Sequence, residues 1–267
     1  MNFKDLFNYN KVVINLGGYL KFLKYYTFNH NIVSSVSPKE KLLKNKHSNK
    51  CYICALGPSL KDVDFEAING DTIVVNRFYK HGETLPGFVP NYYLMIDAAF
   101  ASQKNKEDFF DALKCYEGKN TLFLLNSKLS AFNELKKLNN NISYVSCCKG
   151  LFNSNKSFEL GQVMPAFGNV ACTAIAFAIA LGYEEIYLLG CDFNSFASRK
   201  AVHCYAEKDE KRQISLSYEL YCYSLVAEMH EQLNDYATKK GVRIINTTKG
   251  SLIDAYTYQI DENLYKK

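Results

Sequence analysis

Polar side chains and a glycine follow three successive apolar segments, where they could bind a phosphate, a base or a sugar. The first segment runs into Gly57, Pro58 and Ser59. Gly57 permits a tight turn and a close backbone approach, and the Ser59 hydroxyl can bind a phosphate. The second segment ends at Asn76 and the third at Asp97. Each residue alone could simply close a strand with a local turn, but three polar strand ends in succession favour a ligand site.

A second group of polar residues lies in the C-terminal half of the chain. Gly168 and Asn169 precede a long apolar segment, and a later apolar segment ends at Asp192. A Gly-Asn pair at the start of a helix presents free backbone N–H groups and an amide to an anion or a base. We therefore expect these three residues to contribute to the same ligand site.

The loop that follows Asp192 contains the candidates for catalysis, Arg199, His203 and Tyr205. A neutral imidazole near pH 7 is suited to accept a proton from a hydroxyl group. His203 is the only histidine that we expect both at this edge of the sheet and among cations. The hypothesis is a general base; the alternative is an exposed loop histidine without a role.

Short apolar segments alternate with helical patterns from residue 51 onward. Strands are predicted at 51–56, 72–76, 92–96, 121–125, 142–146, 185–191 and 243–247, and helices at 104–116, 128–138, 168–182 and 215–240. Several strands are apolar on both faces, as in parallel sheets covered by helices. The alternation predicts an α/β fold: a Rossmann-like open, mainly parallel sheet with helices on both faces. Ligands of such sheets bind beyond the carboxyl ends of the strands.

The glycine pattern excludes two nucleotide-binding motifs. The segment LGPSL at 56–60 lacks the G-x-G-x-x-G of a dinucleotide fold, and no G-K-[ST] sequence of a P-loop is present. This argues against NAD and against a Walker-type ATPase.

We separate residues 1–49, a basic, amphipathic leader, from a catalytic domain at 50–267. Nine lysines against two acidic residues give the first fifty residues a net charge of +7, whereas the whole chain carries +5. Apolar residues recur at helical spacing over 12–26, typical of a helix on an anionic membrane or packed on the main domain. Ser37 and Pro38 are predicted to be the N-cap and first residue of a short helix, followed by a polar linker over 45–50.

The nine cysteines, the lengths of the apolar segments and the N-terminal residues indicate the cellular compartment. An odd number of scattered cysteines in apolar runs favours reduced thiols, and Cys51 and Cys54 form a C-x-x-C within a strand rather than a zinc site. No apolar stretch is long enough to span a membrane, and no secretory signal is recognised. We expect a cytoplasmic protein with peripheral contact at the inner membrane through residues 1–45, and no nucleic-acid partner.

Three motifs together resemble a known family. They are GPSL (57–60), NRFY (76–79) and ALGYEEIYLLGCDF (180–193), the last followed by His203. Over about residues 50–250 the chain resembles the bacterial CMP-sialic acid-dependent sialyltransferases and the related 6-hydroxymethylpterin diphosphokinase-like (MptE-like) Rossmann family. In the sialyltransferases, the Gly-Pro-Ser turn and the Asn before Phe-Tyr line the CMP site, and a His acts as the base. The resemblance implies these roles for Gly57, Ser59, Asn76 and His203.

The chain departs from the sialyltransferase pattern at four places, one of them the helix start, where the Ser-Gly of the pattern is replaced near Gly168-Asn169. Leu56 replaces an Asn before the Gly-Pro-Ser turn, Asn194 replaces a Tyr after the Asp-Phe pair, and Asp97 stands where an Asn is usual. Asp97 is closer to the MptE-like pattern. The departures leave the fold expectation intact and bear on the identity of the donor.

The expected activity is transfer of a nonulosonic (sialic-acid-like) sugar from a CMP donor to a cell-surface glycan precursor, either a glycan or a lipid-linked acceptor. His203 is the expected base, and Arg199 and Tyr205 are expected to stabilise the leaving CMP phosphate. No metal or resident cofactor is expected, since the CMP-sugar is a substrate. Two alternatives remain: an MptE-like diphosphokinase using ATP and Mg²⁺ at Asp97 and Asp192, and a non-catalytic nucleotide-binding partner in polysaccharide assembly.

Overall fold

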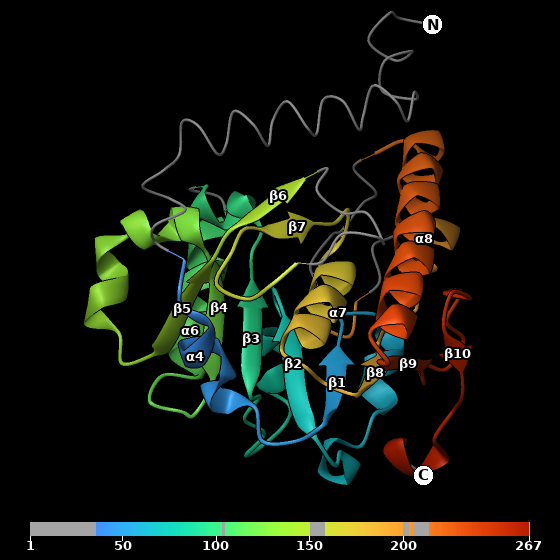
Figure 1. Cartoon of the computed structure of the whole chain (residues 1–267), viewed down its shortest axis with the longest axis horizontal. Helices are drawn as coiled ribbons and strands as arrows, with labels where there is room; N and C mark the ends of the chain where they lie inside the picture. The colour runs from blue at the N-terminus through green and yellow to red at the C-terminus, as the bar shows by residue number, and fades with distance from the viewer. Residues whose placement is uncertain (1–35, 103–104, 150–157, 200–202, 206–213, 267) are drawn as a thin grey trace, which may run out of the picture.

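The computed structural model describes residues 36–102, 105–149, 158–199, 203–205 and 214–266. Within these residues, an eight-stranded sheet has the order β10-β9-β8-β1-β2-β3-β4-β5, and every neighbouring pair is parallel (Figure 1). The strands are β1 (Lys50–Cys54), β2 (Asp71–Val75), β3 (Tyr92–Met95), β4 (Leu122–Asn126), β5 (Asn141–Val145), β8 (Glu185–Leu189), β9 (Arg243–Asn246) and β10 (Thr257–Tyr258). The predicted Rossmann-like parallel sheet is confirmed.

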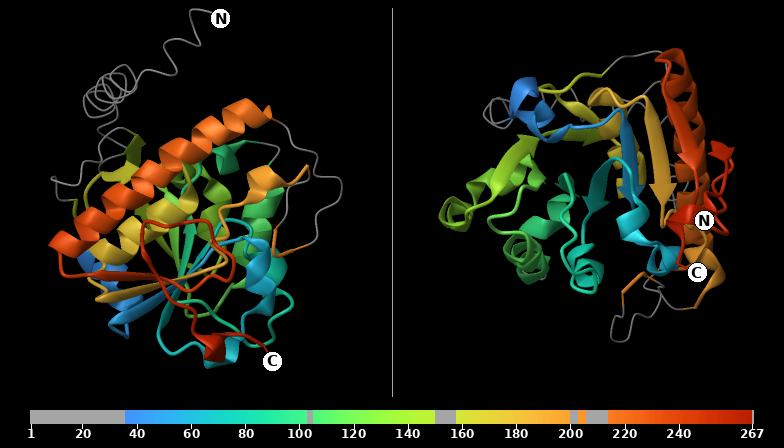
Figure 2. Two further views of the ribbon diagram at one scale, coloured as in Figure 1. Left: turned by 90° about the vertical axis from the view of Figure 1, so that its right-hand side faces the viewer. Right: turned by 90° about the horizontal axis from the view of Figure 1, so that it is seen from below.

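Helices cover both faces of this sheet, which therefore forms the middle of three layers (Figure 2). One face carries α4 (Lys39–Leu42), α7 (Val170–Ala180) and α8 (Leu216–Lys239). The other carries α5 (Tyr79–Gly82), α6 (Lys106–Cys115) and the 3₁₀ helix η2 (Pro58–Asp62). Further 3₁₀ turns are η1 (Leu43–Asn45), η3 (Phe65–Ala67), η4 (Ala98–Ala101), η8 (Ser195–Ala197) and η9 (Glu262–Leu264).

Strand β1 is apolar on both faces because both faces are covered. Successive side chains of a strand point to opposite sides. Cys51 and Ile53 pack toward α7, while Tyr52 and Cys54 pack into the cluster on the other face. The two thiols of the C-x-x-C sequence therefore lie on opposite sides of the sheet.

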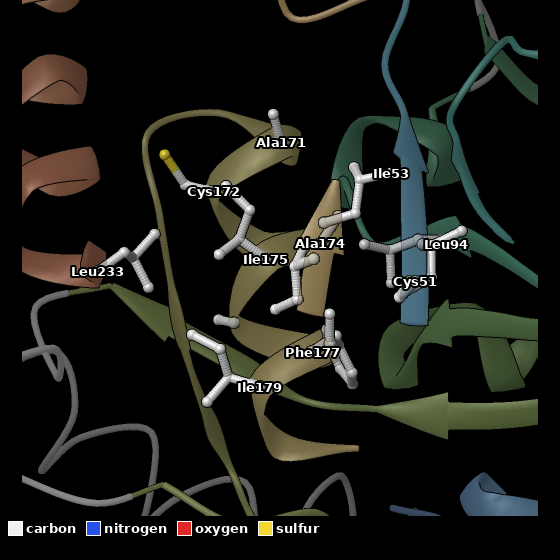
Figure 3. Close-up of a cluster of buried hydrophobic side chains, with 14 of the residues drawn as sticks. Cys51, Ile53, Leu94, Ala171, Cys172, Ala174, Ile175, Phe177, Ile179 and Leu233 are labelled. Carbon is white, nitrogen blue, oxygen red and sulfur yellow. The ribbon is translucent and has the colours of Figure 1, made fainter. Parts of the chain in front are cut away.

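Helix α7 is buried on every side, as its uniformly apolar sequence predicts. Figure 3 shows Ala174, Ile175 and Phe177 of α7 between the strand residue Ile53 and Leu233 of α8. Phe177 is fully buried, and burying a side chain of this kind stabilises the fold by about 1.5–3 kcal/mol. This packing fixes the start of α7 relative to the central strands.

The strand order reverses at β1. From β1 the chain adds strands in one direction as far as β5, and it then crosses back to place β8 on the other side of β1. The carboxyl ends of β1 and β8 therefore flank a topological switch point, where open α/β sheets bind their ligands.

In the outer part of the fold, one sequence-based prediction was wrong and one pair of strands was missed. The predicted helix over 128–138 is a pair of 3₁₀ helices, η6 (Ser127–Ala131) and η7 (Asn133–Lys137). Phe132 between them is extended (φ −76°, ψ 109°), and its ring packs near those of Phe109 and Phe110. This aromatic packing separates the two turns. A small parallel pair, β6 (Cys147–Lys149) and β7 (Met164–Ala166), was not predicted.

Ser37 does not cap the helix that follows it. Pro38 is the N-cap of α4, and Ser37 pairs with Tyr144 at the end of β5: its backbone N–H donates to the Tyr144 carbonyl, and its hydroxyl accepts from the Tyr144 N–H. Leu42 enters the core, and Asn45, predicted in a linker, is buried with its amide donating to the Asn91 carbonyl. Residues 36–49 thus pack on the sheet.

The amphipathic segment expected over 12–26 lies outside the described residues. Among the described helices, none combines the length and apolarity required to cross a bilayer.

Candidate functional site

The turns after β1 and β8 are hydrogen-bonded to each other at the switch point. The Ala55 N–H donates to the Leu189 carbonyl, and the Gly57 N–H donates to the Gly190 carbonyl, both at 2.8 Å. Pro58 follows as the first residue of η2. The Gly57-Pro58-Ser59 turn predicted from the sequence therefore lies directly against the end of β8.

Asp192 anchors this turn through both of its carboxylate oxygens. Oδ1 accepts the Ser59 N–H at 3.2 Å, and Oδ2 accepts the Ser59 hydroxyl at 2.8 Å. Burial raises the pKa of Asp192, and the hydrogen bonds from Ser59 oppose this rise. The Ser59 proton that we expected to bind a phosphate is directed at Asp192, so Asp192 organises the turn and the Ser59 oxygen is left as an acceptor.

Asn76 adopts a left-handed backbone conformation, which is uncommon for residues other than glycine but is tolerated by asparagine. Its φ is +48°, in the left-handed region. The Tyr93 hydroxyl holds this turn, donating to the Asn76 carbonyl at 2.7 Å and accepting the Tyr79 N–H at 2.9 Å. Such a conformation persists only where the surrounding structure enforces it. Residues of this kind cluster at binding and catalytic sites.

The Asn76 side chain has an unused acceptor. Its Oδ1 is buried and has no hydrogen-bond partner among the described residues. Leaving a buried acceptor unsatisfied costs about 1–3 kcal/mol. A ligand that brings an N–H or O–H donor to this oxygen would recover that free energy.

Residues 77–80, which follow Asn76 and lead into α5, form a cluster of charges with Asp108 of α6. The carboxylate accepts from Arg77 Nε at 2.8 Å and from the Tyr79 hydroxyl at 2.8 Å, and Lys80 Nζ lies 3.3 Å away. Burial acts to raise the pKa of Asp108, but the Tyr79 hydrogen bond and the two cations outweigh it, so the pKa lies below its usual range. Sequence reasoning missed Asp108 and Lys80; the NRFYK sequence of 76–80 was the available signal.

The loop that carries His203 is attached to the first turn. The Cys204 N–H donates to the Leu56 carbonyl at 2.9 Å. The His203 and Tyr205 rings stack with their centroids 5.1 Å apart and their planes 13° apart. Lys80 Nζ lies 5.5 Å from the centroid of the Tyr205 ring. The structure therefore brings His203 and Tyr205 to the Gly57–Ser59 turn and to α5, although more than a hundred residues separate them in sequence.

Two other loop residues are placed differently. Arg199 is exposed, and the adjoining residues 200–202 lie outside the described part of the chain. Near Asn194, where the related pattern has a tyrosine, the Ser195 hydroxyl lies 2.6 Å from the Tyr223 hydroxyl of α8. Tyr223 was not identified from the sequence, because its position on a long helix gives no sign of which loop it meets.

The start of α7 lies at the same edge of the sheet, because a helix that leads into a parallel strand runs antiparallel to it. Asn169 is the N-cap, and its Oδ1 accepts the Cys172 N–H at 2.8 Å. Gly168 is exposed, and its N–H faces Met229 Sδ at 3.2 Å. The predicted Gly168-Asn169 helix start is present, with the Asn169 oxygen used in capping.

Asp97 stands apart from Asp192. Asp97 is exposed after β3 and caps η4 by accepting the Ala99 N–H. Strands β1 and β2 lie between β3 and β8, which at about 4.8 Å per strand separates the two strand ends by about 14 Å. Across the described ranges, no cluster of three or more His, Cys, Asp or Glu side chains could hold a metal ion.

Buried thiols lie beneath the site but are not poised as nucleophiles. Cys54, Cys191 and Cys204 are all buried. Burial raises the pKa of Cys191 and of Cys204 to about 12 and that of Cys54 further. The thiolate is the nucleophilic form of cysteine, and these thiols stay protonated. They therefore contribute to core packing and not to catalysis.

No family model matches the chain, and no curated protein matches it. Several solved structures are similar to it. One is the sialyltransferase CstII from Campylobacter jejuni, in complex with the substrate analogue cytidine-5'-monophosphate, with 18% identity over 83% of this chain and 88% of that chain and a TM-score of 0.49. Another is the monofunctional alpha-2,3-sialyltransferase Cst-I from Campylobacter jejuni, with 16% identity over 84% of this chain and 83% of that chain and a TM-score of 0.49.

Proposed function

We propose that this chain is a glycosyltransferase that moves a nonulosonic sugar from a CMP donor to a glycan or lipid-linked acceptor. One observation carries the proposal: the Cys204–Leu56 hydrogen bond holds the His203 loop against the Gly57–Ser59 turn at the switch point. A candidate base and a candidate nucleotide site thereby adjoin each other. The GPSL, NRFY and ALGYEEIYLLGCDF motifs, which supply Ser59, Asn76 and Asp192, support the same reading.

The donor nucleotide would bind at the ends of β1 and β2. The buried Asn76 Oδ1 has no partner among the described residues and suits a donor group of the ligand, such as the amino group of cytosine or a ribose hydroxyl. Gly57 lets the backbone approach the nucleotide, and the N-terminal N–H groups of α7 favour an anionic phosphate or carboxylate. Asp192 contributes by holding Ser59 in place.

His203 would act as the general base. Its imidazole accepts the proton of the acceptor hydroxyl as the oxygen attacks the anomeric carbon of the donor sugar. The bond from that carbon to the phosphate oxygen breaks, and its electron pair leaves with CMP. Tyr205 and Arg199 would stabilise the charge on the departing phosphate, with no metal required.

A thermal-shift experiment on the full chain tests the nucleotide assignment. CMP, UMP and ATP are each added with EDTA and, separately, with Mg²⁺. Ligand at a hundredfold excess over Kd stabilises the native state by about 2.7 kcal/mol, which raises Tm by roughly 5–10 °C in a protein of this size. We expect this shift with CMP in EDTA and a smaller one with UMP, which has no amino group.

The opposite pattern would contradict the proposal. A shift that appears only with ATP and Mg²⁺ indicates phosphoryl-transfer chemistry instead. If CMP binds, release of CMP from a CMP-nonulosonate is then measured with and without a glycan acceptor. Acceptor-dependent release supports the transferase; binding without any release supports a nucleotide-binding partner that lacks catalysis.

A further inference from the structure

Three side chains from two distant segments form a continuous stack beside the first turn. Lys80 Nζ of α5 lies 5.5 Å from the centroid of the Tyr205 ring, within the range of a cation–π contact. The Tyr205 ring in turn stacks on the His203 imidazole at 5.1 Å, nearly parallel. The imidazole is therefore packed against a ring that itself rests beside a fixed cation.

Lys80 is also held by an ion pair. Its ammonium lies 3.3 Å from Asp108 Oδ1 on α6, and the Asp108 carboxylate is itself fixed by Arg77 and by the Tyr79 hydroxyl. The Lys80 side chain is only 30% exposed. A long, flexible lysine side chain is thus restrained by an ion pair at one side and by an aromatic ring at another.

The backbone of α5 is restrained as well. The Tyr79 N–H is bonded to the Tyr93 hydroxyl of β3, which also holds the carbonyl of Asn76. The Tyr93 hydroxyl therefore ties the backbone beside Lys80 to the sheet, through the same turn that contains Asn76.

We propose that Lys80 is a positioning residue for His203: it fixes the Tyr205 ring, and through that ring the orientation of the imidazole. The inference deepens the proposed function, since its catalytic consequence requires that His203 is the base. Lys80 itself need not touch the substrate. A base that is displaced by about 1 Å from its productive geometry loses a large part of its effect on rate, so a fixed ring matters for turnover.

A backbone hydrogen bond and core packing also hold this loop. His203 and Tyr205 lie on a loop and not on a strand or helix, and their backbone is tied to the first turn by the Cys204 N–H. That bond fixes the main chain, and the Tyr205 side chain is buried in the core cluster on this face of the sheet. The cation–π contact with Lys80 and the stack of the two rings restrain the side-chain torsions further.

The test compares Lys80→Met with Lys80→Arg in the full chain. Methionine keeps the aliphatic stem and removes the cation, whereas arginine retains a cation that can lie over the tyrosine ring. The first measurement is the rate at which diethyl pyrocarbonate modifies His203, followed by peptide mass spectrometry. Exposed His47, remote in sequence from α5, is the internal control.

We expect the Lys80→Met change to speed modification of His203 about three- to tenfold, the factor that loss of a cation–π contact corresponds to. Lys80→Arg should stay within about twofold of the parent, and the His47 rate should not change. Asp108→Asn removes the ion-pair partner of Lys80 but leaves the charge of Lys80 in place. This change should also speed modification of His203, by a smaller factor than Lys80→Met. Equal His203 rates in the parent and in Lys80→Met would overturn the inference.

The second measurement separates this inference from the proposed function. With a CMP-nonulosonate donor, Lys80→Met should lower kcat several-fold while KM for the donor stays unchanged, and Lys80→Arg should restore most of kcat. If the parent shows no CMP-sugar turnover, the proposed function fails, yet the modification rates still decide whether Lys80 orders His203. If turnover is present and Lys80→Met raises only KM, Lys80 contacts the donor and the positioning role is wrong.

Discussion

Gly57 and Asp192 approach so closely that no side chain could stand between them. A methyl carbon built on Gly57 would lie 1.9 Å from Asp192 Oδ2 and 2.5 Å from the Gly190 carbonyl oxygen. The backbone of Gly57 is itself unstrained, with φ −67° and ψ 157°. Glycine is therefore required here by contact with the end of β8, and not by its freedom to adopt unusual torsions.

Gly57→Ala should destabilise the protein by about 3 kcal/mol or more, because the carboxylate and a carbonyl would both have to move. The same change should abolish any CMP-induced rise in Tm. Gly250→Ala is the matched control, since its Cβ would meet nothing within 4 Å and its φ of +71° adds only left-handed strain, about 1–2 kcal/mol. Urea unfolding of the two variants makes the comparison; equal losses would remove the steric argument.

Asn76→Gly separates binding from stability at the second strand end. Glycine accepts the φ of +48° without cost, so Tm should stay level or rise slightly. Loss of the amide oxygen should weaken CMP binding about ten- to a hundredfold, as expected when a buried hydrogen bond is removed. Isothermal titration calorimetry measures the affinity.

Asn140→Ala serves as the control for Asn76. Asn140 also has a buried Oδ1 without a partner among the described residues, but its amide donates to the Leu113 carbonyl at the end of α6, away from the switch point. Its replacement should lower Tm and leave CMP affinity intact. Weakened CMP binding in Asn140→Ala, or unchanged binding in Asn76→Gly, would argue against a ligand at Asn76.

His203→Gln should lower kcat by about 10²–10⁴-fold, the usual contribution of a general base. Affinity for CMP should stay within a few-fold of the parent, because His203 faces the acceptor in the proposed reaction. Single-turnover assays with saturating donor measure the chemical step directly. Near-normal turnover in this variant would exclude His203 as the base, and His47→Gln should behave as the parent.

His230 should make the stability of the fold depend on pH. It is fully buried, with Nδ1 2.8 Å from the Tyr256 hydroxyl and Nε2 3.4 Å from Cys172 Sγ, and burial lowers its pKa to about 4. In the unfolded chain the pKa of histidine is about 6.5. The native state therefore disfavours the protonated imidazole. The contribution of neutral His230 to the free energy of unfolding is complete above about pH 6.5 and is lost as the pH falls toward 4.

The loss between pH 7.5 and pH 5 should be about 2 kcal/mol in the free energy of unfolding. Urea titrations at the two pH values measure it for the parent and for His230→Gln. The variant should start less stable but lose less on acidification. A pH dependence that is the same in both proteins would mean that other groups are responsible.

The sheet could be predicted from the sequence because its strands are short, apolar on both faces and separated by helical patterns. The polar ends at Ser59, Asn76 and Asp192 followed from the same reasoning, since the carboxyl ends of parallel strands share one edge. Side-chain partners at that edge could not be predicted. Whether Asp192 meets Ser59 or Asp97 depends on strand order, and apolar periodicity does not report strand order.

The other misses have local causes. The residues of 128–138 have helix-forming composition, but Phe132 leaves the helical conformation where its ring meets α6. Lys80 has no feature of its own that separates it from other surface lysines. Its contact with Tyr205 arises only because the Cys204–Leu56 bond folds a distant loop back onto α5.

The central place of β1 also has a consequence for synthesis of the chain on the ribosome. Its neighbour β2 follows almost at once, but β8 on its other side emerges only after β2 to β7 have been made. At about 5–20 residues per second, one edge of this apolar strand stays unpaired for on the order of ten seconds. An open strand edge is a site for wrong pairing and aggregation. Nascent chains that end before residue 185 should therefore depend on chaperones that cover β1.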